Sequence, residues 1–425
     1  MHAPATGVAM RFVLFGLACL TSAAVWLLVE PEILTAHHYR PHTVAWAHLV
    51  VLGFILSVIA GALYQIAPVA METKLYSARL AEFHFVAHFL GVGFMVPFFT
   101  VWDLKQVGHG GSLVFLGMLI FVGNIARTLN RAPRPDVVGA FIASSMLWLF
   151  LTMGAGLTIA TNKFWPFLPG SQLNWMYAHA HLGVGGVFIN LTAGVSLRLA
   201  PMFTLSEIRS AARAWWAFAL VNLGVAGLFW AIVSGSPPAQ RAFGGVLVVG
   251  LGVYGAELRA IFAARKRRRL DWGLWQFFFA VATLAPVAIV GLAIVSPVAF
   301  RPETLERWQT GYALLALLGV IVPAILGMLQ KILPFLIWQR VYAPFIGRRP
   351  VPSLGQLSSE SIQGAVFWSY LVALVALLAA AISGSNGLAR GAAAIWLAVV
   401  ALFLVNAGQI LGHWFRPRTC LARSP

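Results

Sequence analysis

Three histidines in this chain of 425 residues have types and spacings suited to ligand chemistry. His179 and His181 form a His-x-His pair, and His48 lies far upstream in the sequence. Imidazole is the commonest metal ligand in proteins and an axial ligand of haem iron. Two residues correspond to about 200° around a helix, so His179 and His181 should point to nearly opposite sides. We therefore expect them to serve two different centres rather than to chelate one ion.

A second candidate site consists of His84 and His88, with Glu82 close by. Residues spaced i,i+4 project from one helix face, so this pair is suited to share a metal ion. The alternative is an inward polar face that serves as a proton path or lies beside a haem propionate. At 1.5 Å per residue, His84 is roughly 25 Å from the level of His48. The two groups of histidines therefore cannot form one mononuclear site.

The sequence around these histidines recurs at a fixed spacing along the chain. We call this spacing, which equals the separation between His48 and His181, the repeat length. The pattern His-x4-Gly-x7-Gly-x6-Pro occurs at His48, Gly53, Gly61 and Pro68, and again at His181, Gly186, Gly194 and Pro201. A third copy, one repeat length further on, lacks the histidine and consists of Leu314, Gly319, Gly327 and Pro334. Such self-similarity indicates an internal triplication. We expect a single membrane domain, 1–425, with repeats of approximately 1–135, 136–270 and 271–425.

The composition places these patterns in a membrane. The chain is 60% hydrophobic and 10% charged, whereas soluble domains carry about 25% charged residues. About 20 apolar residues span a bilayer. Runs of that length are continuous rather than alternating, which favours helices over a barrel. They occur near 8–30, 44–69, 80–102, 112–129, 138–160, 175–200, 213–234, 241–263, 273–296, 308–336, 362–384 and 389–413. The predicted fold is all-α, with twelve transmembrane helices as three pseudo-symmetric four-helix repeats.

The net charge of +17 is distributed as a topology signal. Clusters of Arg and Lys, such as 265–269 and 348–349, follow even-numbered helices, and the loops after odd-numbered helices hold scattered cations. The positive-inside rule then predicts that both termini are cytoplasmic, in a multi-pass protein of the cell inner membrane. Nucleic acid is not an expected partner. On this topology His48, His179 and His181 lie near the outer boundary. The alternative to a ligand role is that these are positions at the membrane interface, which Trp46 and Tyr312 occupy as belt aromatics in the other copies of the repeat.

The chain resembles subunit I of the haem-copper oxidases. Around His48 the sequence continues with Gly53-Phe54, Gly61, Tyr64 and Pro68, which is similar to a helix of the cbb-type (C-family) subunit, and Ala178-His179-Ala180-His181 looks like that family's His-x-His. A looser similarity links the chain to the haem- and copper-containing NnrS family of nitric-oxide-response membrane proteins. In both cases the protein would be an integral membrane protein that binds haem.

The resemblance implies roles for the histidines. His48 and His181 would be axial ligands of a low-spin, b-type haem, and His179 would bind a second haem or copper. The partners would be other respiratory-complex subunits, with a cytochrome c or quinol donor, and the chemistry would be electron transfer or reactions of dioxygen or nitric oxide. The family's His-x-His lies in helix 10 rather than helix 6, and its adjacent His-His pair has no match here. An incomplete haem-copper site is therefore expected, and no catalytic residue is assigned.

The sequence leaves the enzyme question open. If the chain is an enzyme, it is an oxidoreductase of the cytochrome c oxidase or nitric oxide reductase type. The alternative is a non-enzymatic NnrS-like, oxidase-assembly, copper-handling or transport protein on the same scaffold.

Overall fold

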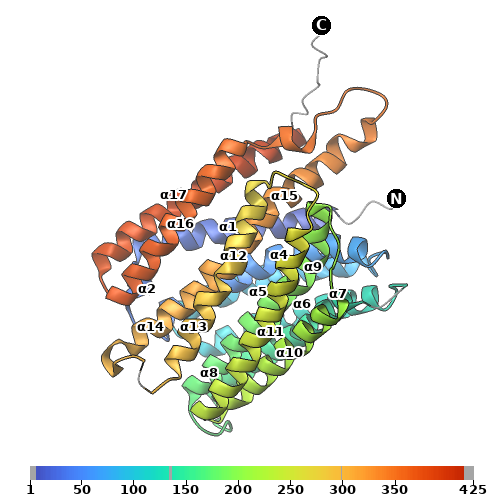
Figure 1. The fold of residues 1–425 in the computed structure, drawn as a ribbon. Coiled ribbons are helices and arrows are strands. Elements are labelled where there is room, and N and C mark those ends of the chain that lie inside the picture. The colour runs from blue at the N-terminus through green and yellow to red at the C-terminus, as the bar shows by residue number, and fades with distance from the viewer. Residues whose placement is uncertain (1–5, 134–135, 298, 416–425) are drawn as a thin grey trace.

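The computed structural model describes residues 6–133, 136–297 and 299–415, and the regular secondary structure in these ranges is entirely helical. Twelve helices there are long and apolar enough to cross a membrane, which confirms the predicted fold class. The boundaries agree closely with the hydrophobic runs, except that the fourth helix begins at Leu104 and the tenth extends over Pro302–Val341. Figure 1 shows the helices side by side in one elongated bundle.

The helices are described in chain order. The first four spans comprise α1 (Thr6–Val29), the short α2 (Glu32–Thr35), α3 (Pro41–His48) continuing into η1 (Leu49–Leu56) and α4 (Ser57–Ala70), α5 (Ala78–Thr100) and α6 (Leu104–Leu129). The next four comprise α7 (Val137–Asn162), α8 (Gln172–His181) continuing into η2 (Leu182–Ile189) and α9 (Asn190–Thr204), α10 (Ala211–Val233) and α11 (Pro237–Ala263).

The last four spans follow the same plan. They comprise α12 (Trp272–Ala282) with α13 (Leu284–Ile294), α14 (Pro302–Leu314) continuing into η3 (Leu315–Ile321) and α15 (Val322–Val341), α16 (Glu360–Ser383) and α17 (Asn386–Phe415). Two short 3-10 turns, η4 (Ala343–Phe345) and η5 (Leu354–Leu357), lie in the loop between α15 and α16.

The second span of each group contains a π-helical segment directly after the position of the repeated histidine. These segments begin at Leu49, Leu182 and Leu315, each one repeat length after the previous one. π-Helical turns are rare in proteins and occur frequently at functional sites. The π-helical segments thus recur along the chain with the same spacing as the sequence pattern.

The repeated glycines face the first helix of their own group. A Cβ on Gly61 would lie 2.7 Å from the carbonyl oxygen of Ala9, and one on Gly194 would lie 2.2 Å from Cβ of Phe141. A Cβ on Gly327 would lie 2.5 Å from the carbonyl oxygen of Gly273. A side chain at any of these positions would push two helices apart, because the interiors of helix bundles are tightly packed.

A small apolar cavity of about 100 Å³ lies where α4, α9 and α15 meet. Its lining repeats with the sequence, since the same set of positions in α4 lines it again one repeat length later in α9 and two repeat lengths later in α15. These positions are Val58, Ile59, Ala62, Leu63 and Ile66, then Leu191, Thr192, Val195, Ser196 and Leu199, then Ala324, Ile325, Met328, Leu329 and Ile332. The three second spans therefore surround one central axis with equivalent faces.

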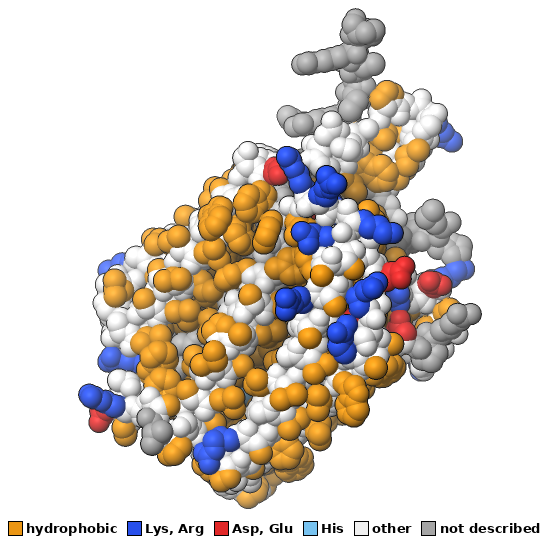
Figure 2. All heavy atoms as spheres, viewed as in Figure 1, with side chains coloured by type: hydrophobic (Ala, Val, Ile, Leu, Met, Phe, Trp, Pro, Cys, Tyr) orange, Lys and Arg blue, Asp and Glu red, His pale blue; other side chains and the backbone are white. Residues whose placement is uncertain are grey.

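The flanks of the bundle are apolar and its ends are charged. Figure 2 shows hydrophobic side chains spread along the flanks, with Lys and Arg gathered toward the ends and most densely at one of them. This pattern fits a chain whose flanks contact lipid, and the protein is a multi-pass membrane protein. We call the end that carries His48, His179 and His181 the histidine end, and the opposite end, with Arg265–Arg269, the basic end. The terminal residues on which the predicted orientation partly rests lie outside the described residues.

Candidate cofactor site

His48, His179 and His181 share one arrangement at the histidine end. In each ring Nδ1 lies within hydrogen-bond distance of a backbone carbonyl oxygen: Val44 for His48 at 2.8 Å, Thr152 for His179 at 3.0 Å and Tyr177 for His181 at 2.7 Å. Because a carbonyl oxygen can only accept, Nδ1 carries the proton and Nε2 presents its lone pair. Metal-bound histidines are held in this way, with the second ring nitrogen donating to a carbonyl or carboxylate.

All three rings line one large cavity of about 810 Å³. This size lies within the range of 300–1,000 Å³ typical of ligand pockets. The lining is mostly apolar and includes Phe99, whose ring stacks on His48 at a centroid distance of 4.5 Å. Lys163 and Arg241 also line the cavity, and no Asp or Glu among the described residues does so. The cavity therefore fits an apolar ligand with anionic groups.

His181 points toward the third repeat, where Tyr312 of α14 faces it. The Tyr312 hydroxyl is 3.3 Å from Nε2 of His181, and the two rings are nearly parallel, with an interplanar angle of 25°. Tyr312 thus packs inside the bundle, and the belt-aromatic interpretation of this position is wrong. Trp46 is also buried, 3% exposed, and donates from its indole to the carbonyl oxygen of Ala23.

His179 points the other way, toward α7. Its ring lies against Gly156, where an added Cβ would be 3.1 Å from Cε1. The predicted opposite orientation of His179 and His181 is what these contacts show. Among the described residues, Nε2 of His48 and Nε2 of His179 have no hydrogen-bond partner.

The repeat relates these positions to one another. A displacement by one repeat length carries His48 onto His181 and His179 onto Tyr312. The contact of His181 with Tyr312 joins the second and third repeats. The equivalent pair between the first and second repeats is His48 with His179. The resemblance to the oxidases predicts a pair of His48 and His181 instead. The repeat favours His48 with His179, because the contact of His181 with Tyr312 joins the same two positions between the second and third repeats.

His84 and His88 lie elsewhere, in the packed interior of the first group. Both are fully buried, and their ring centroids are 5.7 Å apart. Nδ1 of His84 is 2.9 Å from the Tyr64 hydroxyl, and Nε2 of His88 is 2.9 Å from the Ser57 hydroxyl. Neither ring lines the large cavity, and no group of three or more His, Cys, Asp or Glu in the described ranges is arranged to hold a metal ion. A metal at His84 and His88 stays a prediction.

Residues from all three repeats line the cavity and contact one another at the histidine end. Nε2 of His38 is 2.9 Å from the Tyr177 hydroxyl, which in turn lies 3.4 Å from Oε1 of Gln309. Burial, assisted by the charge of neighbouring His37 and opposed by that of Glu306, lowers the pKa of His38 to about 4. His38 is therefore neutral at pH 7 and bonds to Tyr177 without a charge.

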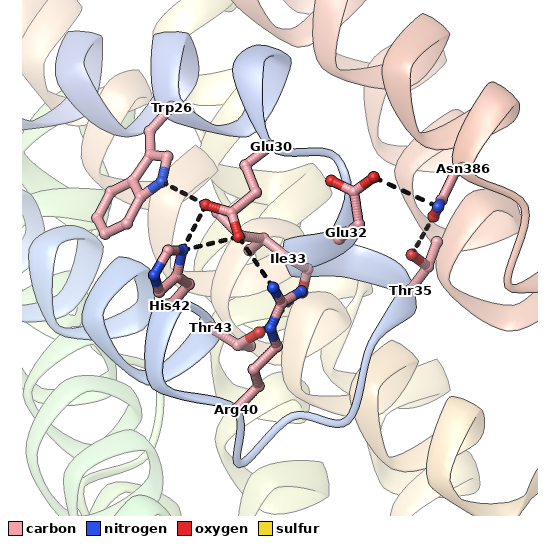
Figure 3. A network of polar contacts seen from close by, with 9 residues as sticks. All are labelled: Trp26, Glu30, Glu32, Ile33, Thr35, Arg40, His42, Thr43 and Asn386. Atoms are coloured by element: carbon pink, nitrogen blue, oxygen red, sulfur yellow. Dashed lines mark hydrogen bonds and ion pairs between the residues drawn. The ribbon is translucent and has the colours of Figure 1, made fainter. Parts of the chain in front are cut away.

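The loop that carries His38 is held by a polar network around Glu30, shown in Figure 3. The Glu30 carboxylate accepts from Nδ1 of His42 at 2.6 Å and from the Trp26 indole at 3.1 Å, and Arg40 lies 3.5 Å away. Burial alone would raise the pKa of Glu30. The hydrogen bonds from His42 and Trp26 and the charges of His42 and Arg40 outweigh burial and lower the pKa below its ordinary value.

Comparison with known proteins places this fold in a class. The chain superposes on a chain from a heme-copper terminal oxidase dimer with a TM-score of 0.71, over 97% of this chain and 85% of that chain, at 10% sequence identity. The protein therefore has the fold of a heme-copper terminal oxidase. In sequence it is 25% identical over 360 residues to an uncharacterized protein of Aquifex aeolicus (strain VF5), covering 83% of this chain and 87% of the relative. No model of a protein family matches the chain.

Proposed function

We propose that this chain is a membrane cytochrome that binds one b-type haem between His48 and His179 and serves in electron transfer. The observation that carries the proposal is the pair of imidazoles whose Nδ1 atoms are fixed by carbonyl oxygens and whose Nε2 atoms open into a shared apolar cavity. The imidazoles of His48 and His179 would hold the haem, which would supply one-electron redox chemistry.

The surroundings of the pair support this ligand. Phe99 stacks on His48 and fixes the plane of its ring, and Thr152 and Gly156 hold the ring of His179 from α7. Lys163 lines the cavity, and its charge would attract the carboxylates of a haem. Because no described acidic side chain lines the cavity, nothing there would repel these carboxylates.

The pairing also bears on the reaction. A haem held by both His48 and His179 would be suited to electron transfer rather than to binding dioxygen or nitric oxide, so electron transfer is the role that this site favours. The chain then needs a separate electron donor and acceptor. The proposal includes such partners in the membrane, either other respiratory subunits or a lipid-soluble quinol.

The visible spectrum of the purified protein tests the proposal. After expression with sufficient haem, we expect the reduced protein to show the sharp bands of a low-spin b-type haem and the pyridine haemochrome to give one haem per chain. Carbon monoxide should change the reduced spectrum little, because both axial positions are filled. A folded protein without haem, or a haem that binds carbon monoxide fully, contradicts the proposal.

A further inference from the structure

The cavity contains a second position built on the same plan as the proposed haem site. His181 stands where His48 stands one repeat earlier, with its Nδ1 fixed by the carbonyl oxygen of Tyr177 as that of His48 is fixed by Val44. The facing residue is Tyr312 in place of His179. When the two pairs are compared, therefore, only the residue that faces the histidine differs in chemistry.

The difference closes the iron position. An iron between two imidazole nitrogens needs a gap of roughly 4 Å, since each metal–imidazole bond is about 2 Å long. The gap between the Tyr312 oxygen and Nε2 of His181 is 3.3 Å. The hydroxyl donates its hydrogen into that gap, because Nε2 of His181 carries the lone pair. The Tyr312 hydroxyl thus forms a hydrogen bond with the one atom of His181 that could bind iron.

Leu247, Gly291 and Arg241 line the same cavity as His181 and Tyr312. A Cβ on Gly291 would be 3.0 Å from Cε2 of Tyr312, so the phenol ring already fills the space beside α13. A histidine is shorter than a tyrosine, so at position 312 it would draw back from His181 and widen the gap.

The third pair of repeats shows the same positions without any ligand. Leu314 replaces the histidine, and the indole of Trp46 is engaged by the carbonyl oxygen of Ala23. The three positions form a series of two histidines, one histidine with a tyrosine, and none.

We propose that Tyr312 restricts the chain to a single haem by closing a second haem position at His181. The inference rests on the proposed haem between His48 and His179. Of the two residues that face each other at each position, the one at 312 then decides whether haem binds. Tyr312 acts here as a specificity-determining residue.

The test is the haem content of Tyr312→His, measured as pyridine haemochrome per chain in protein that elutes as a single folded species. We expect two haems per chain in this variant and one in the wild type and in Tyr312→Phe, which fills the space without a ligand. The double variant His181→Ala/Tyr312→His should return to one. Electron paramagnetic resonance of the oxidised variant should show a second low-spin signal.

The outcomes separate the two proposals. One haem in the wild type and one in folded Tyr312→His overturns the role of Tyr312 and leaves the proposed function intact. Two haems in the wild type also overturn it, and no haem in any variant overturns both. If Tyr312→His does not fold, Tyr312→Ala with added imidazole supplies the missing ligand. A second low-spin haem that appears with imidazole supports the inference, and its absence contradicts it.

Discussion

At the scale of single residues, the neighbours of a histidine decide its role more than its place in a motif does. His179 and His181 are two residues apart, yet one lies against Gly156 and the other against Tyr312. Their opposite orientation could be predicted from helix geometry. The residue that each would face could not, because this depends on the order of the repeats around the central axis. Spacing along one helix carries no information about that order.

Gly156 should matter through its contact with the His179 ring. Gly156→Ala would place a Cβ 3.1 Å from Cε1, so the imidazole must move by a few tenths of an ångström. We expect haem affinity to fall on the order of tenfold, as for changes around other ligating histidines. Haem titration of the purified apoprotein measures this. Gly154→Ala on the same helix is the matched control, because a Cβ there meets nothing within 4 Å; equal losses in the two variants would count against the contact.

Glu30 should make stability depend on acid pH. Its pKa is lower in the folded protein than the ordinary value of about 4.3. The ionised carboxylate therefore stabilises the fold fully above that ordinary value, and the contribution is lost as pH falls through the folded pKa. We expect Glu30→Gln to lower the free energy of unfolding by on the order of 1 kcal/mol at pH 7.

The measurement is thermal unfolding in detergent at neutral and acid pH. The gap between wild type and Glu30→Gln should shrink as the pH falls toward 3. A gap that stays constant over this range would show that the Glu30 charge contributes nothing, and that the substitution acts through shape alone.

At the scale of elements, the twelve spans and their repeat could be predicted from run length and from the constant displacement between the three copies of the pattern. Shared faces followed from helix periodicity, as the glycines facing the first helices show. The π-helical segments could not be predicted, because no residue pattern distinguishes Leu182–Ile189 from an ordinary apolar turn. They shift each histidine relative to the lower half of its helix, so side-chain directions computed from a uniform α-helix fail across them.

Paired ions tie the second span to the first in two repeats. Asp136 and Asp271 begin α7 and α12, accept from the backbone N–H of Gly139 and Leu274, and pair with Arg198 and Lys331 respectively. The two cations lie one repeat length apart. The equivalent residue in the first repeat is Gln65, so this connection is confined to the second and third groups.

The Asp271 pair should contribute measurably to stability. Asp271→Asn keeps a helix-capping side chain but leaves Lys331, whose side chain is 13% exposed, without its carboxylate. We expect a loss of about 1–3 kcal/mol in unfolding free energy, less than for a fully buried pair because Asp271 is partly exposed. Asp271→Asn/Lys331→Met should recover part of the loss. Thermal unfolding of both variants measures these changes in stability. If the double variant is no more stable than Asp271→Asn, the ion-pair account is contradicted.

At the scale of the whole molecule, the backbone repeats three times, whereas the residues at the histidine positions differ between the repeats. The three second spans surround one axis with equivalent residues, and the axial cavity shows this directly. The ligand positions around the same axis carry different residues in each repeat. Fold similarity to a heme-copper oxidase is therefore compatible with a simpler redox site than such an oxidase uses.

The orientation of the bundle is a prediction at this scale. The positive-inside rule places the basic end in the cytoplasm and the histidine end outside. We expect Ser171→Cys, in the loop before α8, to react with a membrane-impermeant maleimide on intact cells, because the Ser171 side chain caps no helix and is exposed. Arg268→Cys should react only after permeabilisation. Both substitutions should be made in a Cys420→Ser background, in which the remaining native cysteine, Cys19, is buried. The reverse labelling pattern would contradict the predicted orientation.

The haem content of three histidine variants tests the central claim most directly. In the wild type we expect one low-spin haem per chain. His48→Ala and His179→Ala should each lower its occupancy by roughly tenfold or more, whereas His181→Ala should keep one haem with an unchanged low-spin spectrum. Loss of the haem in His181→Ala together with its retention in His179→Ala would contradict the pairing of His48 with His179.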